Sequence, residues 1–142
     1  MKIAIGSDHA GFELKEQLIA YLNEKNIEVN NKGCYSLDRA DYPDFGHAVA
    51  LSVLSKEVDF GILMCGSGNG INMTANKHAG IRAALCWNSE IASLSRLHND
   101  ANILVLPARY ITVDEAKKCV DAFFDNAFEG GRHADRLAKI DC

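Results

Sequence analysis

The chain has 142 residues, 48% of them apolar and 24% charged, which is the size and composition of a single globular domain over residues 1–142. The net charge is −4 with histidine neutral, and this argues against a general nucleic-acid surface, because such surfaces need clustered Lys and Arg. The sequence shows no signal-peptide pattern and no apolar run of bilayer length. We therefore expect a cytoplasmic protein that contacts no membrane.

The five cysteines are odd in number, and no two of them form a C-x-x-C motif. This spacing argues against a disulfide framework and against a cysteine-ligated zinc site. We expect free thiols, most of them buried like small hydrophobes and at most one or two reactive, at Cys34, Cys65, Cys86, Cys119 and Cys142.

The first half of the sequence alternates short apolar runs with longer amphipathic stretches. Residues 2–5 are expected to form a buried strand, which is interrupted by the polar, glycine-containing residues 6–11. From Leu14 onward the apolar residues share one helical face, and Asn26 is the expected end of that helix. Then come a short strand at residues 27–30, a polar loop, and a helix carrying Phe45, Val49, Val53 and Leu54.

The second half continues the alternation. Three further strands are expected, at residues 60–64, 81–86 and 103–106. The strand at 60–64 is apolar on both faces, so it should be central. A helix should follow each of these strands. The first helix should begin after a glycine loop, the second at Asn88 or Ser89, and the third at a T-x-x-E capping box formed by Thr112 and Glu115. A last short helix is expected after Gly131.

Five strands joined by helices predict an α/β protein with a three-layer, doubly wound, five-stranded parallel sheet. Its crossovers should be right-handed. In such folds ligands bind beyond the carboxyl ends of the strands, where the strand order reverses. The loops after the first and third strands are therefore the first places to look for chemistry.

The loop after the third strand carries three alternating glycines, Gly66, Gly68 and Gly70, with Ser67 and Asn69 between them. Glycines allow a close backbone approach, and the amide groups at a helix N-terminus favour an anion. The alternative is a tight turn without a ligand. We favour the anion-binding interpretation because of the position of the loop and its glycine density.

Cys65 ends the third strand immediately before this loop. A thiolate there could act as a general base, or the residue could be an ordinary buried cysteine. Asp8 and His9 end the first strand, where they could transfer protons or bind hydroxyl groups. Asp8 could equally be a helix cap, and we favour the cap on the residues alone. His98 near a helix C-terminus is by itself more typical of a structural residue.

Arg132 and Arg136 lie four residues apart, on one helical face. They could clamp a phosphate group together with His133, or they could form a solvated basic surface, which their spacing alone slightly favours. Arg109 could be a further phosphate contact or an ordinary loop residue. No metal-binding set stands out among the scattered histidines, which are His9, His47, His78, His98 and His133.

Seven segments taken together are more specific than any one of them. They are residues 6–12 (GSDHAGF), 41–44 (DYPD), 65–68 (CGSG), 75–77 (ANK), 80–83 (GIRA), 97–102 (LHNDAN) and 130–133 (GGRH). Their combination resembles the ribose-5-phosphate isomerase B and galactose-6-phosphate isomerase family. The resemblance extends from residue 1 to about residue 140, in one order and without large gaps.

The resemblance implies a Rossmann-like fold that interconverts an aldose phosphate and a ketose phosphate, chiefly ribose 5-phosphate and ribulose 5-phosphate. It implies no metal and no organic cofactor. It also implies a homodimer with shared active sites; whether dimers pair into tetramers stays open. In the family the partner subunit typically supplies the residues that match His98, Asn99 and Arg109.

The family's roles carry over by position. Cys65 matches the base that moves a proton between C2 and C1, and Ser67 matches a hydroxyl residue beside the reacting oxygens. His98 matches the group that helps to open the sugar ring, with Asp8 nearby, and Asn99 matches a substrate-binding amide. The phosphate site is matched by His9, Arg109, Arg132 and Arg136, while the loop of Gly66, Ser67, Gly68, Asn69 and Gly70 is expected to hold the enediolate.

One branch of the family has glycine at the position of Cys65 and uses a glutamate at the position of Ile71. Ile71 cannot accept a proton, so we expect this chain to belong to the branch that uses the cysteine as the base. Its sequence Ser67-Gly68-Asn69-Gly70 nevertheless resembles the glutamate branch. Two alternatives remain: the same reaction on a hexose 6-phosphate such as galactose or allose 6-phosphate, and a non-catalytic phosphosugar-binding module.

Overall fold

A computed structural model describes residues 1–141, so the expected free thiol at position 142 lies outside the described residues. Five strands are present: β1 (Lys2–Ser7), β2 (Glu28–Asn31), β3 (Phe60–Cys65), β4 (Ala83–Leu85) and β5 (Ile103–Pro107). A 3-10 turn η1 (His9–Gly11) precedes six helices, α1 (Phe12–Glu24), α2 (Tyr42–Leu54), α3 (Asn69–Ala75), α4 (Ser89–Asn99), α5 (Val113–Phe124) and α6 (Arg132–Leu137). No helix among the described residues is both long enough and apolar enough to span a bilayer.

The strands form one parallel sheet in the order β2-β1-β3-β5-β4. This confirms the predicted α/β fold with a five-stranded parallel sheet and a central third strand. From β1 the chain moves outward to β2, and from β3 it moves the other way, so the strand order reverses between β1 and β3. Those two strands pair directly, with Ser7 opposite Met64. The reversal therefore brings the loops after β1 and β3 side by side.

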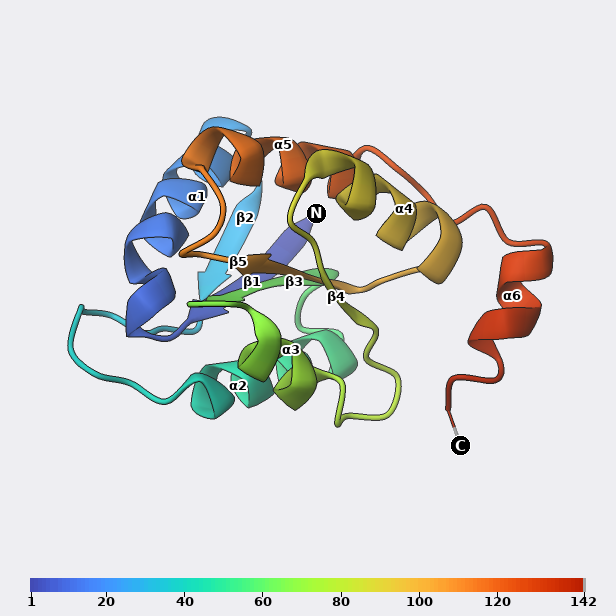
Figure 1. Ribbon diagram of the computed structural model, residues 1–142, viewed down its shortest axis with the longest axis horizontal. Coiled ribbons are helices and arrows are strands. Elements are labelled where there is room, and N and C mark those ends of the chain that lie inside the picture. The colour runs from blue at the N-terminus through green and yellow to red at the C-terminus, as the bar shows by residue number, and fades with distance from the viewer. Residues whose placement is uncertain (142) are drawn as a thin grey trace.

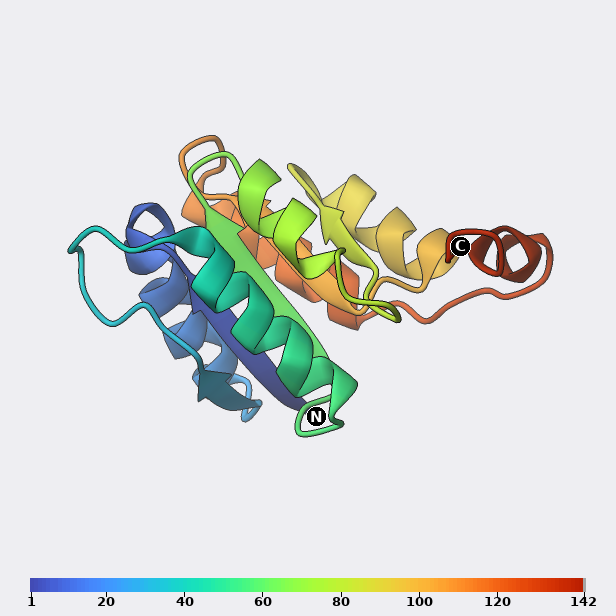
Figure 2. The same cartoon turned by 90° about the horizontal axis from the view of Figure 1, so that it is seen from below.

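Helices cover both faces of the sheet, which makes three layers (Figure 1). The helices α1, α4 and α5 pack on one face, around Leu18, Leu104 and Phe123. The helices α2 and α3 pack on the other face, around Val49, Leu63 and Ile71. The short helix α6 stands apart from both layers and packs against the end of α4 (Figures 1 and 2).

Two predicted elements differ from the structure in detail. The strand expected at residues 81–86 is shorter, because side chains replace the ladder at its start: Arg82 N–H donates to Asn102 Oδ1 and Ala83 N–H donates to Asn76 Oδ1. The capping box forms only half. The hydroxyl of Thr112 accepts from Glu115 N–H at 3.1 Å, but the Glu115 carboxylate accepts from Ser89 N–H at 2.8 Å instead of turning back on its own helix.

Candidate active site

Asp8 and Cys65 meet at the carboxyl edge of the sheet. Because Ser7 pairs with Met64, Asp8, the residue after β1, lies at the level of Cys65, the last residue of β3. Both are buried, with 7% of Asp8 and 4% of Cys65 exposed. A carboxylate and a thiol are thus held side by side at the reversal point, where a ligand is expected.

The glycine loop after Cys65 presents free backbone donors. Within residues 1–141, the amides of Gly66, Ser67, Gly68 and Gly70 donate to no protein acceptor. Gly68 has a φ of +80° and turns the chain into α3, and a Cβ there would lie 2.5 Å from Leu85 Cδ1. The loop can therefore hold an oxyanion beside Cys65.

Asp8 fills the capping role that its residue type favours and keeps one oxygen available. Its Oδ1 accepts from Ala10 N–H at 3.0 Å and from Gly11 N–H at 3.2 Å, which holds the side chain in place. No group among the described residues donates to its second oxygen. The cap and the proposed chemistry are thus compatible.

His9 is oriented by the loop that leads into α2. His9 Nδ1 lies 3.2 Å from both the N–H and the carbonyl oxygen of Ala40, so it accepts from Ala40 N–H in one tautomer and donates to Ala40 O in the other. When Nδ1 accepts, the proton sits on Nε2, which is then a free donor for an anion. Half-buried His9 therefore fits the phosphate contact expected of it.

Arg109 belongs to the same edge. Its N–H donates to Gly66 O at 3.0 Å, and a Cβ on Gly66 would lie 3.2 Å from the Arg109 guanidinium. The resemblance implies that Arg109 reaches into the site of a partner subunit, and within its own chain Arg109 lies against the glycine loop. A cavity of about 420 Å³ adjoins this loop, lined by Ser67, Asn69, Leu85, Trp87, Pro107 and Tyr110.

The other predicted site residues lie at the opposite edge of the sheet. His98 and Asn99 end α4, just before the amino end of β5, whereas Cys65 pairs with Pro107 at the carboxyl end of β5. At 3.3 Å per residue, β5 alone separates the two edges by about 13 Å. Arg132 and Arg136 are exposed on α6, a helix that stands apart from the sheet (Figure 2). One chain therefore holds two half-sites that do not meet.

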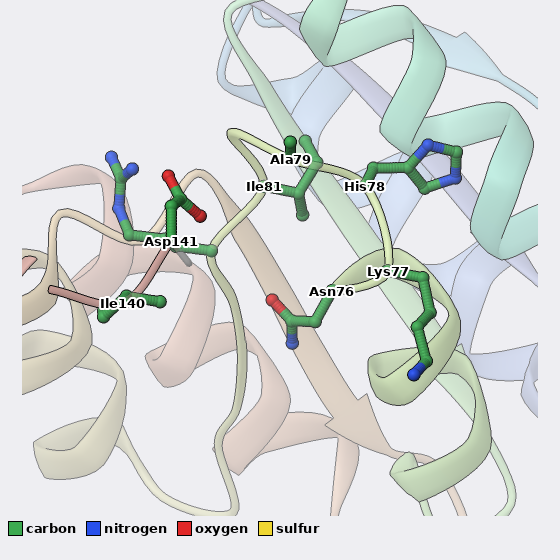
Figure 3. Close-up of a pocket in the computed structure, with 8 residues that line it drawn as sticks. Asn76, Lys77, His78, Ala79, Ile81, Ile140 and Asp141 are labelled. Carbon is green, nitrogen blue, oxygen red and sulfur yellow. The ribbon is translucent and has the colours of Figure 1, made fainter. Parts of the chain in front are cut away.

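A second cavity, of about 410 Å³, is lined by none of the predicted site residues. It lies between the end of α3 and the C-terminal segment, with Asn76, Lys77 and His78 on one side and Ile140 and Asp141 on the other (Figure 3). It opens beside the segment before β4, away from Cys65. This cavity is therefore not part of the site at the strand reversal.

Comparison with known proteins decides the family. The sequence model described as Ribose/Galactose Isomerase matches residues 3–140. The chain belongs to the ribose/galactose isomerase family. The resemblance expected from the seven sequence segments is thereby confirmed.

Relatives of this family match the chain over nearly its whole length. Ribose-5-phosphate isomerase B of Escherichia coli is 49% identical, over 98% of this chain and 93% of that protein. A crystal structure of a ribose 5-phosphate isomerase from Thermotoga maritima has a TM-score of 0.97 and 54% identity, covering 99% and 97% of the two chains. The Mycoplasma genitalium enzyme with bound ribulose-5-phosphate has a TM-score of 0.93 and 43% identity, covering 98% and 93%.

The structure of this family member also shows a group that the sequence did not reveal. His133 stacks on His98 with ring centroids 4.3 Å apart, and Glu129 lies within ion-pair distance of both. Burial lowers the pKa of His133, and the nearby charges of His98 and Arg132 lower it further. The spacing E-x-x-x-H of Glu129 and His133 was the available signal, but nothing in the sequence linked it to His98.

Proposed function

We propose that this protein interconverts ribose 5-phosphate and ribulose 5-phosphate through an enediolate, with Cys65 as the base. The observation that carries the proposal is the pairing of a buried thiol with unpaired loop amides at the strand reversal. Membership of the ribose/galactose isomerase family supports the same reaction. A site of this kind needs only proton transfer and oxyanion binding.

The reaction begins with ring opening, because only the open-chain sugar has a carbonyl that acidifies the neighbouring C–H. We assign ring opening to His98 of a second copy of the chain, which would act beside Asp8, in line with the family roles. The thiolate of Cys65 then removes the C2 proton as a general base. Ser67 and Asn99 are placed beside the sugar oxygens.

The enediolate carries negative charge on oxygen. The free amides of Gly66, Ser67, Gly68 and Gly70, with Asn69 at the start of α3, surround the place where this charge develops. Removing one such donor from an oxyanion hole costs about 3–4 kcal/mol of transition-state stabilisation. A proton then passes from O2 to O1, and the Cys65 thiol returns its proton to C1, which gives the ketose and leaves Cys65 as the thiolate it was at the start.

The phosphate group is assigned to cations on both edges. His9 and Arg109 lie on the Cys65 edge, whereas Arg132 and Arg136 lie on the distant α6. Guanidinium groups bind phosphate with paired donors. Binding of the phosphate, far from the reacting carbons, provides the free energy that holds the sugar in position for proton transfer.

A homodimer completes the site in this proposal. The half-site with His98 and Arg132 cannot reach Cys65 of the same chain, but a two-fold axis can bring it to Cys65 of a second copy. Apolar side chains on the outer surface of α2 and α3 are available to cover this contact, since Leu51 is 55% and Met73 65% exposed. A pair of dimers is a further possible assembly.

The cytoplasm is the proposed location. Four of the cysteines are free thiols in the described residues, at Cys34, Cys65, Cys86 and Cys119. Free thiols are typical of a reducing compartment.

The proposed function is tested by Cys65→Ala in the purified protein. Loss of a general base should lower kcat on ribose 5-phosphate roughly 10²–10⁴-fold and leave KM nearly unchanged. Cys119→Ala is the matched control, because Cys119 is a buried thiol in the opposite helical layer and should retain kcat. Full turnover by Cys65→Ala would rule out Cys65 as the base.

The substrate assignment is tested by comparing sugar phosphates. We expect ribose 5-phosphate to be preferred over galactose 6-phosphate and allose 6-phosphate. A hexose phosphate turned over about tenfold faster, equivalent to 1.4 kcal/mol in the barrier, would replace the pentose assignment. Phosphosugar binding without turnover of any of them would instead identify a binding module.

A further inference from the structure

Three side chains from separate parts of the chain converge where α6 meets α4. His98 comes from the last turn of α4, Glu129 from the linker after α5, and His133 from the first turn of α6. Their donor atoms, two imidazole nitrogens and one carboxylate oxygen, all lie within 4.8 Å of one another. The cluster belongs to the half-site at the amino edge of the sheet.

The backbone holds this arrangement in place. Glu129 N–H donates to Leu97 O at 3.0 Å, which ties the linker to the turn of α4 that carries His98. Gly130 and Gly131 then take φ values of +70° and +58°, which L-residues rarely adopt. The resulting turn returns His133 to the same point, where its ring lies nearly parallel to that of His98, at 13°.

The distances between the three potential ligand atoms are slightly longer than those between the ligands of an occupied zinc site. The Glu129 Oε2 atom lies 4.0 Å from His98 Nε2 and 3.8 Å from His133 Nε2. Zinc bonds of 2.0–2.2 Å place tetrahedral ligands roughly 3.3 Å apart. The exposed Glu129 side chain can close its two distances by the roughly 0.5–0.7 Å required. The two imidazoles, which lie within 4.8 Å of one another, would have to approach by up to about 1.5 Å through rotation of the partly exposed His98 side chain.

We propose that His98, Glu129 and His133 bind a divalent transition-metal ion, with Zn²⁺ the preferred one, and that the bound ion inhibits the enzyme. Two imidazoles and a carboxylate are a ligand set that zinc uses, with water in the fourth position. The His98 and Glu129 side chains are 38% and 53% exposed, so an ion can enter from solvent. The inhibition rests on the proposed function, because the ion occupies the nitrogen that His98 needs for ring opening.

His133 is suited to metal binding at neutral pH. Its buried ring has a lowered pKa, so the neutral form with a free lone pair predominates. A metal ligand must be unprotonated.

Binding is tested by calorimetric titration of Zn²⁺ into the full-length, chelator-stripped protein. We expect one ion per chain and at least a tenfold loss of affinity in both Glu129→Ala and His133→Ala. His47→Ala is the control, because His47 and His78 form the other close imidazole pair, at 2.7 Å. Zinc affinity unchanged in both site variants, or lost in His47→Ala, would overturn the proposal.

Spectroscopy and kinetics provide independent readouts. Co²⁺ in place of Zn²⁺ should give the visible bands of a tetrahedral site without the sulfur charge-transfer band of a cysteine ligand, and such a band would contradict the assignment. Zn²⁺ should inhibit the unsubstituted enzyme in proportion to occupancy, whereas Glu129→Ala should keep its basal activity and resist the ion. Because the titration needs no turnover, failure of the metal site and failure of the isomerase assignment are distinguishable.

Discussion

At the scale of single residues, Gly68 has the most demanding position in the candidate site. It combines a φ of +80° with a Cβ position only 2.5 Å from Leu85 Cδ1 and 3.3 Å from Leu106 O. Glycine is the one residue that fits both restrictions. The loop amides depend on this geometry, since Gly68 directs the chain from β3 into α3.

Gly68→Ala should therefore reduce both stability and activity. The positive φ alone costs about 1–2 kcal/mol, and the added methyl displaces the loop from its oxyanion-binding position. Gly130→Ala is the matched control, because Gly130 also has a positive φ, +70°, but has open space around it. Urea denaturation and kcat should show the larger loss in Gly68→Ala, and equal losses in the two variants would contradict the role of the loop.

The thiols of Cys86 and Cys119 should be unreactive in the folded protein. Burial raises the pKa of Cys86 to about 11 and that of Cys119 to about 12. At about pH 8, a thiol with a pKa near 11 is ionised to only about one part in a thousand. Both should resist iodoacetamide in the folded protein and react after unfolding, as mass spectrometry of the peptides would show. Rapid labelling of either in the folded protein would contradict their burial.

At the scale of elements, most of the fold could be predicted from sequence because each signal was local. The apolar run at residues 60–64 and the polar Asn88 cap are both found in the structure. The hydrogen-bond partner of the Glu115 carboxylate, in contrast, could not be predicted from neighbouring residues in the sequence. The position of Glu115 three residues after Thr112 predicted a bond within α5, but Ser89 N–H of α4 lies nearby in the fold and takes that carboxylate. Only tertiary structure could reveal this competition.

Glu115→Ala should therefore destabilise the contact between α4 and α5. Loss of a charge-assisted bond that leaves Ser89 N–H unpaired costs about 1.5–3 kcal/mol. Asp114→Ala is the control, because exposed Asp114 contributes to the same helix terminus only through the helix dipole, at about 0.3–1 kcal/mol. Chemical denaturation should separate the two variants, and equal shifts would show that the link to Ser89 has no effect.

The docking of α6 on α4 should depend on pH. Because burial lowers the pKa of His133, the unfolded chain binds more protons below the ordinary value of 6.5, and stability therefore rises with pH through that window. The charged groups facing His133 are His98, Glu129, Arg132 and Arg136. After correction for the intrinsic pH dependence of amide exchange, the amides of α6 should be less protected at about pH 5 than at about pH 8. His133→Phe should reduce this difference, and an unchanged pH dependence would contradict the assignment.

At the scale of the whole molecule, the candidate site was predictable only in part. The strand pattern located Asp8 and Cys65 at one edge, because carboxyl ends of neighbouring parallel strands lie together. No local pattern could indicate that His98 and Arg132 lie at the opposite edge, since helix α4 runs back across the sheet. The separation of these residues follows from the path of the chain, and in the proposed function a second copy brings them together.

Subunit mixing tests most directly whether the isomerase site is built from Cys65 of one chain and His98 of its partner. Cys65→Ala and His98→Gln should each be nearly inactive alone. After the two variants are mixed, dissociated and reassociated, half of the dimers are mixed and each has one intact site, so about a quarter of the unsubstituted activity should return. Recovery no greater than the sum of the two variants alone would contradict a site shared between subunits.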